Sequence, residues 1–534
     1  MRGTLVRPAP IDGLRLSLRT GAAGQAATWV ARLAVLGALA PIAVYLWIAA
    51  HRLDYPYELD WLEGGAVELV GRVLDGKSLY SAPTLAYVSY TYPPFYTYLS
   101  AAVAEVTGLG FLPLRLVSFA SSLVAFVALG WWVLVATRDR VAAVVAAGLF
   151  AATYGLSGWW FDVGRLDSLF VALTLVALWL GRGARGIRAG VAVGALAFLA
   201  FFTKQIALIA ITPALVWLAL IRPRAGVSAL VVLITFVVGS TLLLDALSGG
   251  WYRYFVVSEL AGQPWQRRMW VGFWRIDLYS HLRPLAWLLA AAILARVAVA
   301  WRQRAGSDHR WALPAIGARA NGRIGPGYEL AAVAGMLLAA WFSRLHTGGY
   351  VNVLMPAYAA CALIGGLAFA AMRRLGPLAG FSAAALVLVQ LAMLLQMPDH
   401  ALPAKSQRAA GAELISRLRT LPGPVLVLAH PWYGTLAGKG SFAQADAITE
   451  VLRSQGASGA GALRSALRGS LNRYGIQAVV LDKLPPSWLA PQLARSFVLQ
   501  PGTITDYLLR PPADLRTAPT LLYVRSDHAR GAAR

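Results

Sequence analysis

Charged residues and cysteine are scarce in this sequence. Lysine, arginine, aspartate and glutamate make up 13% of the 534 residues, about half the share that a soluble protein of this length carries. The single cysteine, Cys361, lies within an apolar run, which excludes a disulfide framework and a zinc site built from cysteine ligands. The low charge argues against a soluble enzyme, and the 58% of hydrophobic residues indicate a membrane protein instead.

The hydrophobic residues gather in long runs, among them residues 141–156, 227–244 and 378–395. Helices of about 17–25 apolar residues cross the hydrocarbon core of a bilayer. The first run, residues 29–50, is too long for the core of a signal peptide and lacks a small-residue cleavage site. We therefore predict a polytopic protein embedded in a lipid bilayer, with a cytoplasmic tail at residues 1–28.

Acidic residues are half as common as basic ones, 24 against 48, and the net charge is +24. The basic residues cluster between the apolar runs, which is the positive-inside pattern that fixes the orientation of membrane helices. No basic face interleaved with aromatic residues on a soluble module accompanies them, so we expect no nucleic-acid partner. The clusters are Arg138 and Arg140; Arg182, Arg185 and Arg188; Arg222 and Arg224; residues 302–323; and Arg373 and Arg374.

With the N-terminus inside, these clusters predict about eleven spans over residues 29–397, that is, a mainly α membrane helix bundle. The loop at residues 51–93 then lies outside. The short apolar piece at residues 94–106 is expected to be re-entrant or interfacial. The outer loop at residues 248–282 carries four arginines against the insertion bias, so we expect them to serve a ligand.

Residues 398–534 have a different pattern of apolar and polar residues from the rest of the chain. Buried-strand patterns occur at residues 424–429 and 477–481, with helical periodicity between them over residues 442–452 and 462–474. We predict a small α/β domain here, placed outside the cell by the last span. The predicted divisions of the chain are residues 1–28, 29–397 and 398–534.

Polar residues that this threading places on the outer side are expected to form one outward-facing site. Lys204 stands in an otherwise apolar stretch, where an ionisable residue indicates function. The inner loops offer only arginines and short turns. The outer set comprises Glu58, Asp60, Glu63, Tyr92, Asp167, Lys204, Gln205, Arg267, Arg268, Arg344, His346 and Asn352.

Such a set fits the transfer of a sugar from a lipid phosphate. The acceptor hydroxyl needs a carboxylate base, for which Asp60 or Glu63 is available. The departing phosphate needs cations or a metal ion. The candidates for the phosphate are Lys204, Arg267, Arg268 and Arg344. The residues assigned to substrate binding are Glu58, Tyr92, Gln205, His346 and Asn352. No cofactor is assigned, and a divalent cation, Mg²⁺ or Mn²⁺, on Asp60 and Glu63 stays an open alternative.

Several motifs follow one another along the chain: an acidic pair after the first span, then GRVLDGKSLY, YTYPPFYTYL, RLD at the start of a span, FFTKQ and GGYVNVLMP. In this pattern residues 29–397 resemble the GT-C superfamily of integral-membrane glycosyltransferases, in particular bacterial members related to protein O-mannosyltransferases and to the aminoarabinose transferase of lipid A. The resemblance implies a catalytic base at Asp60, a second acid at Asp167 and a membrane-embedded lysine at Lys204. Many relatives have adjacent acids in the first loop, whereas Asp60 and Glu63 are three apart, so both remain candidates for the base.

Several of these residues can instead have a purely structural role. Asp167 can cap a helix, and Lys204 can reach the outer interface along its apolar stem. His346 and Asn352 can hold a loop. His430, which follows a predicted strand, is expected to be structural.

The predicted function is transfer of a sugar from a polyprenyl-phosphate donor to a lipid, glycan or protein acceptor on the outer face of a bacterial inner membrane. The alternative is a transporter or flippase for a lipid-linked or sugar substrate. A transporter predicts inverted repeats and broken helices, and the sequence contains neither repeats nor paired interruptions. A non-catalytic scaffold for the α/β domain would not need polar residues concentrated on one side.

Overall fold

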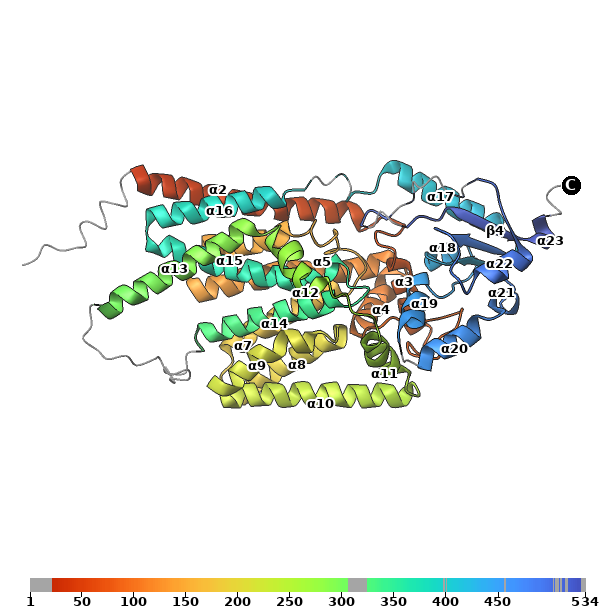
Figure 1. The fold of residues 1–534 in the computed structure, drawn as a ribbon, viewed down its shortest axis with the longest axis horizontal. Coiled ribbons are helices and arrows are strands. Elements are labelled where there is room, and N and C mark those ends of the chain that lie inside the picture. The colour runs from red at the N-terminus through yellow and green to blue at the C-terminus, as the bar shows by residue number, and fades with distance from the viewer. Residues whose placement is uncertain are drawn as a thin grey trace, which may run out of the picture.

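The computed structural model describes residues 22–305, 324–396, 399, 401–455, 458–502, 504, 509, 511–513 and 517–529. Most of these residues lie in helices that run side by side along the long axis of the molecule (Figure 1). A four-stranded sheet with its own helices stands at one end of this bundle. The predicted fold class, a membrane helix bundle with a small α/β domain, is confirmed. The basic cluster expected at residues 302–323 lies mostly outside the described residues.

Within the described part of the chain, eleven helices make up the bundle. Seven of them are long and apolar enough to cross a membrane by length and composition. The other four have 13 to 17 residues, so the number of spans stays a prediction. The eleven are α2 (Ala22–Arg52), α5 (Phe111–Thr137), α6 (Arg140–Ala152), α7 (Asp167–Gly183), α8 (Ile187–Thr203), α9 (Ala207–Ile221), α10 (Pro223–Leu247), α13 (Arg283–Ala305), α14 (Pro326–Leu345), α15 (Met355–Leu375) and α16 (Pro377–Leu394).

The turn between α5 and α6 shows how one predicted basic cluster is held. Arg138 ends α5 in the left-handed conformation, with φ at 55°. Asp139 caps α6 and accepts a hydrogen bond from the N–H of Val141 at 3.0 Å. Arg373 of α15 donates to the same carboxylate at 2.5 Å. The cap and the ion pair together join the ends of three helices.

Small residues let the bundle helices approach closely. A Cβ added to Gly148 of α6 would lie 2.3 Å from the backbone oxygen of Ala38 in α2. Such close backbone contact between small residues is typical of helices that associate in a membrane.

Two short helices lie between the bundle and the sheet. They are α3 (Glu63–Leu74) and α4 (Phe95–Thr107). The 13 residues of α4 span roughly 20 Å, which is too short to cross a bilayer. The apolar face of α4 packs on α3 and on the start of α5. The segment expected to be re-entrant or interfacial is therefore a short helix at the α/β end of the molecule. The remaining short elements of this region are α11 (Trp251–Arg253), η1 (Tyr254–Glu259), α12 (Met269–Gly272), η2 (Phe273–Tyr279) and η3 (Val351–Leu354).

The sheet has the strand order β1-β2-β4-β3. β1 and β2 are parallel, with Val425 opposite Ala478, and the other two pairs are antiparallel. β1 and β2 are buried along their whole length, as their continuous apolar sequences predict. The strands are β1 (Val425–Val427), β2 (Ala478–Leu481), β3 (Phe497–Leu499) and β4 (Leu521–Arg525). The helices of this domain are α17 (Lys405–Thr420), α18 (Pro431–Leu436), α19 (Ala445–Arg453), α20 (Ser458–Leu467), α21 (Ser470–Arg473), α22 (Ala490–Ser496) and α23 (Ser526–Ala529).

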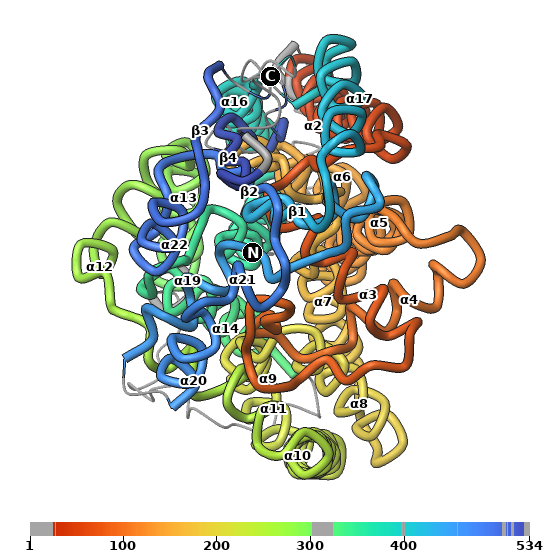
Figure 2. Tube along the Cα trace, turned by 90° about the vertical axis from the view of Figure 1, so that its right-hand side faces the viewer, coloured from red at the N-terminus to blue at the C-terminus, as the bar shows by residue number. Residues whose placement is uncertain are grey.

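The α/β domain is joined to the bundle by backbone hydrogen bonds as well as by packing. The N–H of Ala513 donates to Leu59 O at 2.8 Å, and the N–H of Ala443 donates to Leu85 O at 2.8 Å. Seen from the α/β end, α17 lies over the end of α2, α19 lies beside α14, and α20 lies towards α11 (Figure 2). The outer loop of the bundle is thereby enclosed between helix ends and the α/β domain.

Candidate functional site

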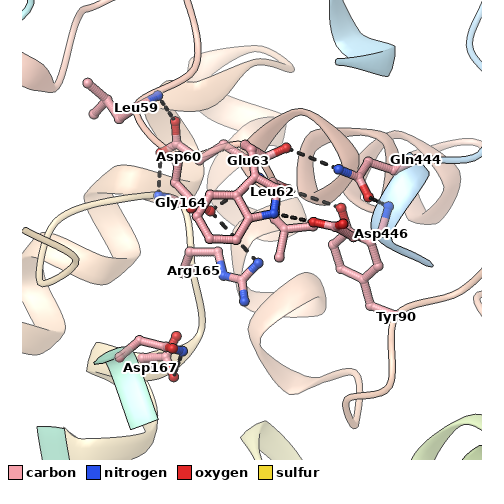
Figure 3. Close-up of polar contacts among 12 residues, drawn as sticks. Leu59, Asp60, Leu62, Glu63, Tyr90, Gly164, Arg165, Asp167, Gln444 and Asp446 are labelled. Carbon is pink, nitrogen blue, oxygen red and sulfur yellow. Dashed lines mark hydrogen bonds and ion pairs between the residues drawn. The ribbon is translucent and has the colours of Figure 1, made fainter. Parts of the chain in front are cut away.

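Asp60 and Arg165 face each other at the α/β end of the bundle (Figure 3). Asp60 lies in the loop between α2 and α3, is fully buried, and accepts a hydrogen bond from the N–H of Leu62 at 3.2 Å. Arg165 belongs to the loop between α6 and α7, and its Nη1 lies 3.9 Å from Asp60 Oδ2. The two charges meet because both loops emerge at the same end of the bundle.

The Arg165 guanidinium has N–H donors that form no hydrogen bond with the described residues. The residue is 5% exposed, and neither Nε nor Nη1 has a hydrogen-bond partner among the described residues. Figure 3 shows the guanidinium between Asp60 and Asp167. Burial lowers the pKa of Arg165, but the neighbouring Asp60, Tyr92 and Asp167 outweigh burial and hold this pKa above its ordinary value. A buried cation with unused donors suits an anionic ligand.

Asp167, Lys204 and Asn352 form a second polar group close by. Asp167 begins α7, Lys204 follows α8, and Asn352 lies in η3. Lys204 Nζ donates to Asp167 Oδ1 at 2.6 Å, and Asn352 Nδ2 donates to the same oxygen at 3.1 Å. Asp167 does not cap its helix, because no side-chain cap bond is formed at this terminus. The Asp167 carboxylate instead neutralises the Lys204 ammonium.

A cavity of about 280 Å³ adjoins this group. It brings together four of the residues predicted to bind donor or substrate, Tyr92, Lys204, Gln205 and His346. Gln205 Nε2 donates to Thr91 O at 2.8 Å, so its amide is oriented by the backbone. Its Oε1 has no hydrogen-bond partner in the described part of the chain, which leaves an acceptor for a bound molecule.

The opposite wall of the cavity carries two glutamates that the sequence did not single out. Glu259 ends η1 and is fully buried, and Glu450 comes from α19 of the α/β domain. Burial, reinforced by the charge of Glu450, raises the pKa of Glu259 to about 9. Burial and the charge of Asp446 raise the pKa of Glu450 to about 7. The cavity is therefore lined by Lys204, whose charge is paired with Asp167, and by Glu259, whose carboxyl holds its proton at neutral pH.

Both carboxylate oxygens of Glu63 accept hydrogen bonds from other groups of the protein. Its two oxygens accept from Arg115 Nε at 3.0 Å and Nη2 at 2.7 Å, and from the N–H of Leu59 at 2.7 Å. The N–H of Gly164 donates to it at 2.5 Å. Burial raises the pKa of Glu63, but Arg115 and the N–H donors outweigh burial and lower it. A carboxylate bonded in this way holds the outer loop together.

The metal ion that the sequence left open does not fit this pair of acids. Both oxygens of Glu63 are engaged by cationic or N–H donors, which repel a cation. In the described residues, no group of three or more His, Cys, Asp or Glu side chains could hold a metal ion. We assign no step of the chemistry to a metal.

Glu58 is not placed to bind substrate. It is 1% exposed, and its Oε2 is hydrogen-bonded to His430 Nδ1. His430 Nε2 lies 3.0 Å from Asp482 Oδ2. Burial lowers the pKa of His430, but Asp482 and Glu58 outweigh it and raise this pKa well above its ordinary value. His430 follows β1 and Asp482 follows β2, so this chain of polar contacts ties the end of the sheet to the outer loop.

The three arginines expected to bind phosphate lie elsewhere. Arg267 and Arg268 are exposed and do not line the Lys204 cavity. Arg344 Nε donates to Asp277 Oδ2 at 2.8 Å, and its Nη1 donates to Gly349 O. Arg344 therefore holds the loop after α14 in place. Exposed arginines do not by themselves indicate a ligand, and no contact among the described residues explains the positions of Arg267 and Arg268.

Arg165 is the main residue that the sequence analysis passed over. A clue was present, because Arg165 is the single basic residue in the outer segment FDVGRLD. No comparable clue marks Glu259 and Glu450, which are 191 positions apart in the sequence and meet only across the interface between the bundle and the α/β domain.

Comparison with known proteins supports the same fold. Residues 90–320 match the model of glycosyltransferase family 87. The crystal structure of ArnT from Cupriavidus metallidurans bound to undecaprenyl phosphate aligns with a TM-score of 0.53 at 16% identity, over 91% of this chain and 97% of that one. Its apo form aligns with a TM-score of 0.49 at 19% identity, over the same shares of the two chains. No curated protein sequence matches. The likeness to the ArnT structure at a TM-score of 0.53 confirms the expected GT-C fold, and the match to glycosyltransferase family 87 over residues 90–320 supports a membrane glycosyltransferase.

Proposed function

We propose that this chain, which has the GT-C fold, transfers a sugar from a polyprenyl-phosphate donor to a hydroxyl group of a lipid, glycan or protein acceptor. The observation that carries the proposal is the buried Arg165 guanidinium, which has unused donors and stands between Asp60 and Asp167. The structure of ArnT with undecaprenyl phosphate bound gives a precedent for a polyprenyl phosphate on this fold.

In the proposed reaction Asp60 is the general base. The acceptor oxygen attacks the anomeric carbon of the sugar and gives its proton to the Asp60 carboxylate. The bond between that carbon and the phosphate oxygen breaks, and its electron pair leaves on the polyprenyl phosphate. Arg165 and Lys204 stabilise the charge that develops on the leaving phosphate.

The Lys204 cavity supplies a place for the sugar. Its volume of about 280 Å³ is enough for one hexose or pentose ring, whose hydroxyl groups need both donors and acceptors. The Gln205 Oε1 atom offers an acceptor, and protonated Glu259 offers a donor. Asn352, which the sequence assigned to substrate binding, instead orients Asp167 in this scheme.

We further propose that the protein lies in a bacterial inner membrane with the α/β domain on the outer side. The basic residues between the apolar helices support this orientation. A reporter that is active only in the cytoplasm, fused after Arg534, should be silent. Strong activity of that fusion would place the α/β domain and the site inside.

The decisive experiment is turnover by the purified protein. It is incubated with a panel of polyprenyl-phosphate sugars and candidate acceptors, and the release of polyprenyl phosphate is measured. Arg165→Gln should lose most of this activity, whereas Arg268→Gln, which removes an exposed charge outside the cavity, should keep it. Equal activity of the two variants, or equal use of a sugar donor without the lipid, would contradict the proposal.

A further inference from the structure

A second, larger cavity lies at the end of the bundle opposite the α/β domain. Its volume is about 800 Å³, and it opens among the ends of α7, α13, α14 and α15, which lie on the left in Figure 1. It is separated from the candidate active site by the length of the bundle. No step proposed above uses it.

Five arginines line this cavity, against a single acid, Glu329. Glu329 Oε1 is already taken by Arg182 Nε at 2.6 Å. The other four are Arg185, Arg222, Arg296 and Arg374. They come from four different segments of the chain, and three of them, Arg185, Arg222 and Arg374, belong to predicted basic clusters.

Part of this positive charge has no counter-ion among the residues that the structure describes. Arg185 and Arg296 make no hydrogen bond or ion pair among the described residues. Burial, together with the charges of Arg185 and Arg182, lowers the pKa of Arg222. Like charges gathered around one space favour an anion inside it.

The remaining walls are apolar and reach the surface that faces lipid. Leu289 and Ile293 of α13 line the cavity together with Ile364 and Leu367 of α15. Ile293 is 53% exposed, and so the cavity opens sideways from the bundle as well as at its end. An apolar wall beneath a basic rim matches a molecule with an acyl chain and an anionic headgroup.

The positive-inside bias that orients membrane helices does not by itself explain why the arginines gather around one cavity. The positive-inside bias needs arginines near the inner ends of helices but does not direct them to a shared cavity. Arg188 and Arg224 illustrate this, since they lie at the same end of the bundle, are exposed, and do not line the cavity. They therefore serve as matched controls for the charge itself.

We propose that this cavity is a binding site for an anionic phospholipid of the inner leaflet, whose phosphate is held by Arg185 and Arg296 and whose acyl chain lies along α13 and α15. The site would bind a membrane lipid independently of the sugar donor. It adds a second lipid-binding function to the chain, remote from the proposed chemistry.

The test is native mass spectrometry of the purified full chain in detergent. Phosphatidylglycerol is titrated against phosphatidylcholine with the same acyl chains, and inorganic phosphate is added in a third series. The double variant Arg185→Gln/Arg296→Gln should bind phosphatidylglycerol about tenfold more weakly. The control Arg188→Gln/Arg224→Gln, which removes the same charge, should change binding less than twofold.

Equal losses in the two double variants, or none in the cavity variant, would overturn the proposal. Displacement of the lipid by inorganic phosphate would show a free anion to be the ligand and would also overturn it. If the cavity variant does not fold, Arg185→Gln alone, at an exposed residue, should still weaken binding about threefold. No sugar is present in these experiments, so their outcome is independent of glycosyl transfer.

Discussion

The Lys204 ammonium lies 2.6 Å from Asp167 Oδ1, and both side chains are almost completely buried. Asn352 donates to the same oxygen, so the pair is fixed from three segments of the chain. A buried cation that loses its counter-ion destabilises a protein by about 3–5 kcal/mol, whereas removing both charges together can be nearly neutral. The pair therefore serves stability even when no donor is bound.

We expect Lys204→Gln to lower the melting temperature and to weaken donor binding. The stability loss arises because Asp167 is left as an unpaired buried charge. The double variant Lys204→Gln/Asp167→Asn should recover much of the melting temperature but not the donor affinity. Both quantities are measured on the purified protein with a polyprenyl-phosphate sugar, with the acceptor affinity as reference. Unchanged donor affinity in both variants would make Lys204 only the counter-ion of Asp167.

The sequence predicted the architecture because its signals are local. Apolar runs and basic clusters define helices and their ends, and continuous apolar runs marked β1 and β2. The same rules placed Tyr92, Lys204, Gln205 and His346 at one end of the bundle, and the structure joins them in one cavity.

The partner of each charged group could not be predicted, because it comes from a distant part of the chain. Glu58, Asp60 and Glu63 lie within six positions, yet they contact His430, Arg165 and Arg115 respectively. Spacing in the sequence cannot decide which of three neighbouring acids faces a substrate. Burial and the nearest cation decide it, and these are properties of the folded chain.

Asp60→Asn should abolish turnover and leave the fold intact. The amide keeps the shape of the side chain and can still accept the N–H of Leu62, but it cannot take the proton of the acceptor. Loss of a general base typically lowers the rate by roughly 10²–10⁴-fold. The release of polyprenyl phosphate measures the effect, and the yield of folded, membrane-inserted protein serves as the control, because removing the Asp60 charge beside the buried Arg165 lowers the melting temperature by itself. Turnover within a few-fold of wild type would exclude Asp60 as the base.

Glu63→Gln should instead lower the stability of the protein and leave the turnover of the folded fraction intact. The fully buried Arg115 would lose its bidentate carboxylate, and a buried pair broken in this way typically costs about 3–5 kcal/mol. We expect a lower yield of folded protein and a lower melting temperature. The fraction that still folds should retain turnover. A stable but inactive Glu63→Gln variant would instead support Glu63 as the base.

His430→Ala should loosen the α/β domain from the bundle. The change leaves the Glu58 and Asp482 carboxyls without the imidazole that separates them. We expect limited trypsin digestion to cut between the two parts several times faster than in wild type. Glu413→Gln, at an exposed position of α17 that is not a trypsin site, is the control. Equal digestion rates for the two variants would show that His430 does not hold the interface.

The last prediction concerns Glu259 and the pH dependence of stability. In an unfolded chain its carboxyl has a pKa of about 4.3, whereas burial and Glu450 raise its pKa in the folded protein to about 9. Between these values the folded state binds more protons than the unfolded state. Stability must therefore fall as the pH rises through this range, by at most about 1.4 kcal/mol per pH unit for one group. Glu450, with its pKa raised to about 7, adds to this loss below pH 7.

Glu259→Gln removes the proton that is released on unfolding, so its melting temperature should fall less than that of wild type between pH 6 and pH 9. At pH 9 the variant should be the more stable of the two, because the buried negative charge is gone. Glu413→Gln, which neutralises an exposed acid of α17, should follow the wild-type curve. Melting temperatures at half-unit steps of pH, with the detergent and salt held constant, give the comparison. Parallel curves for wild type and Glu259→Gln would mean that Glu259 is ionised throughout, and protonated Glu259 could then not donate a hydrogen bond to a sugar hydroxyl in the cavity.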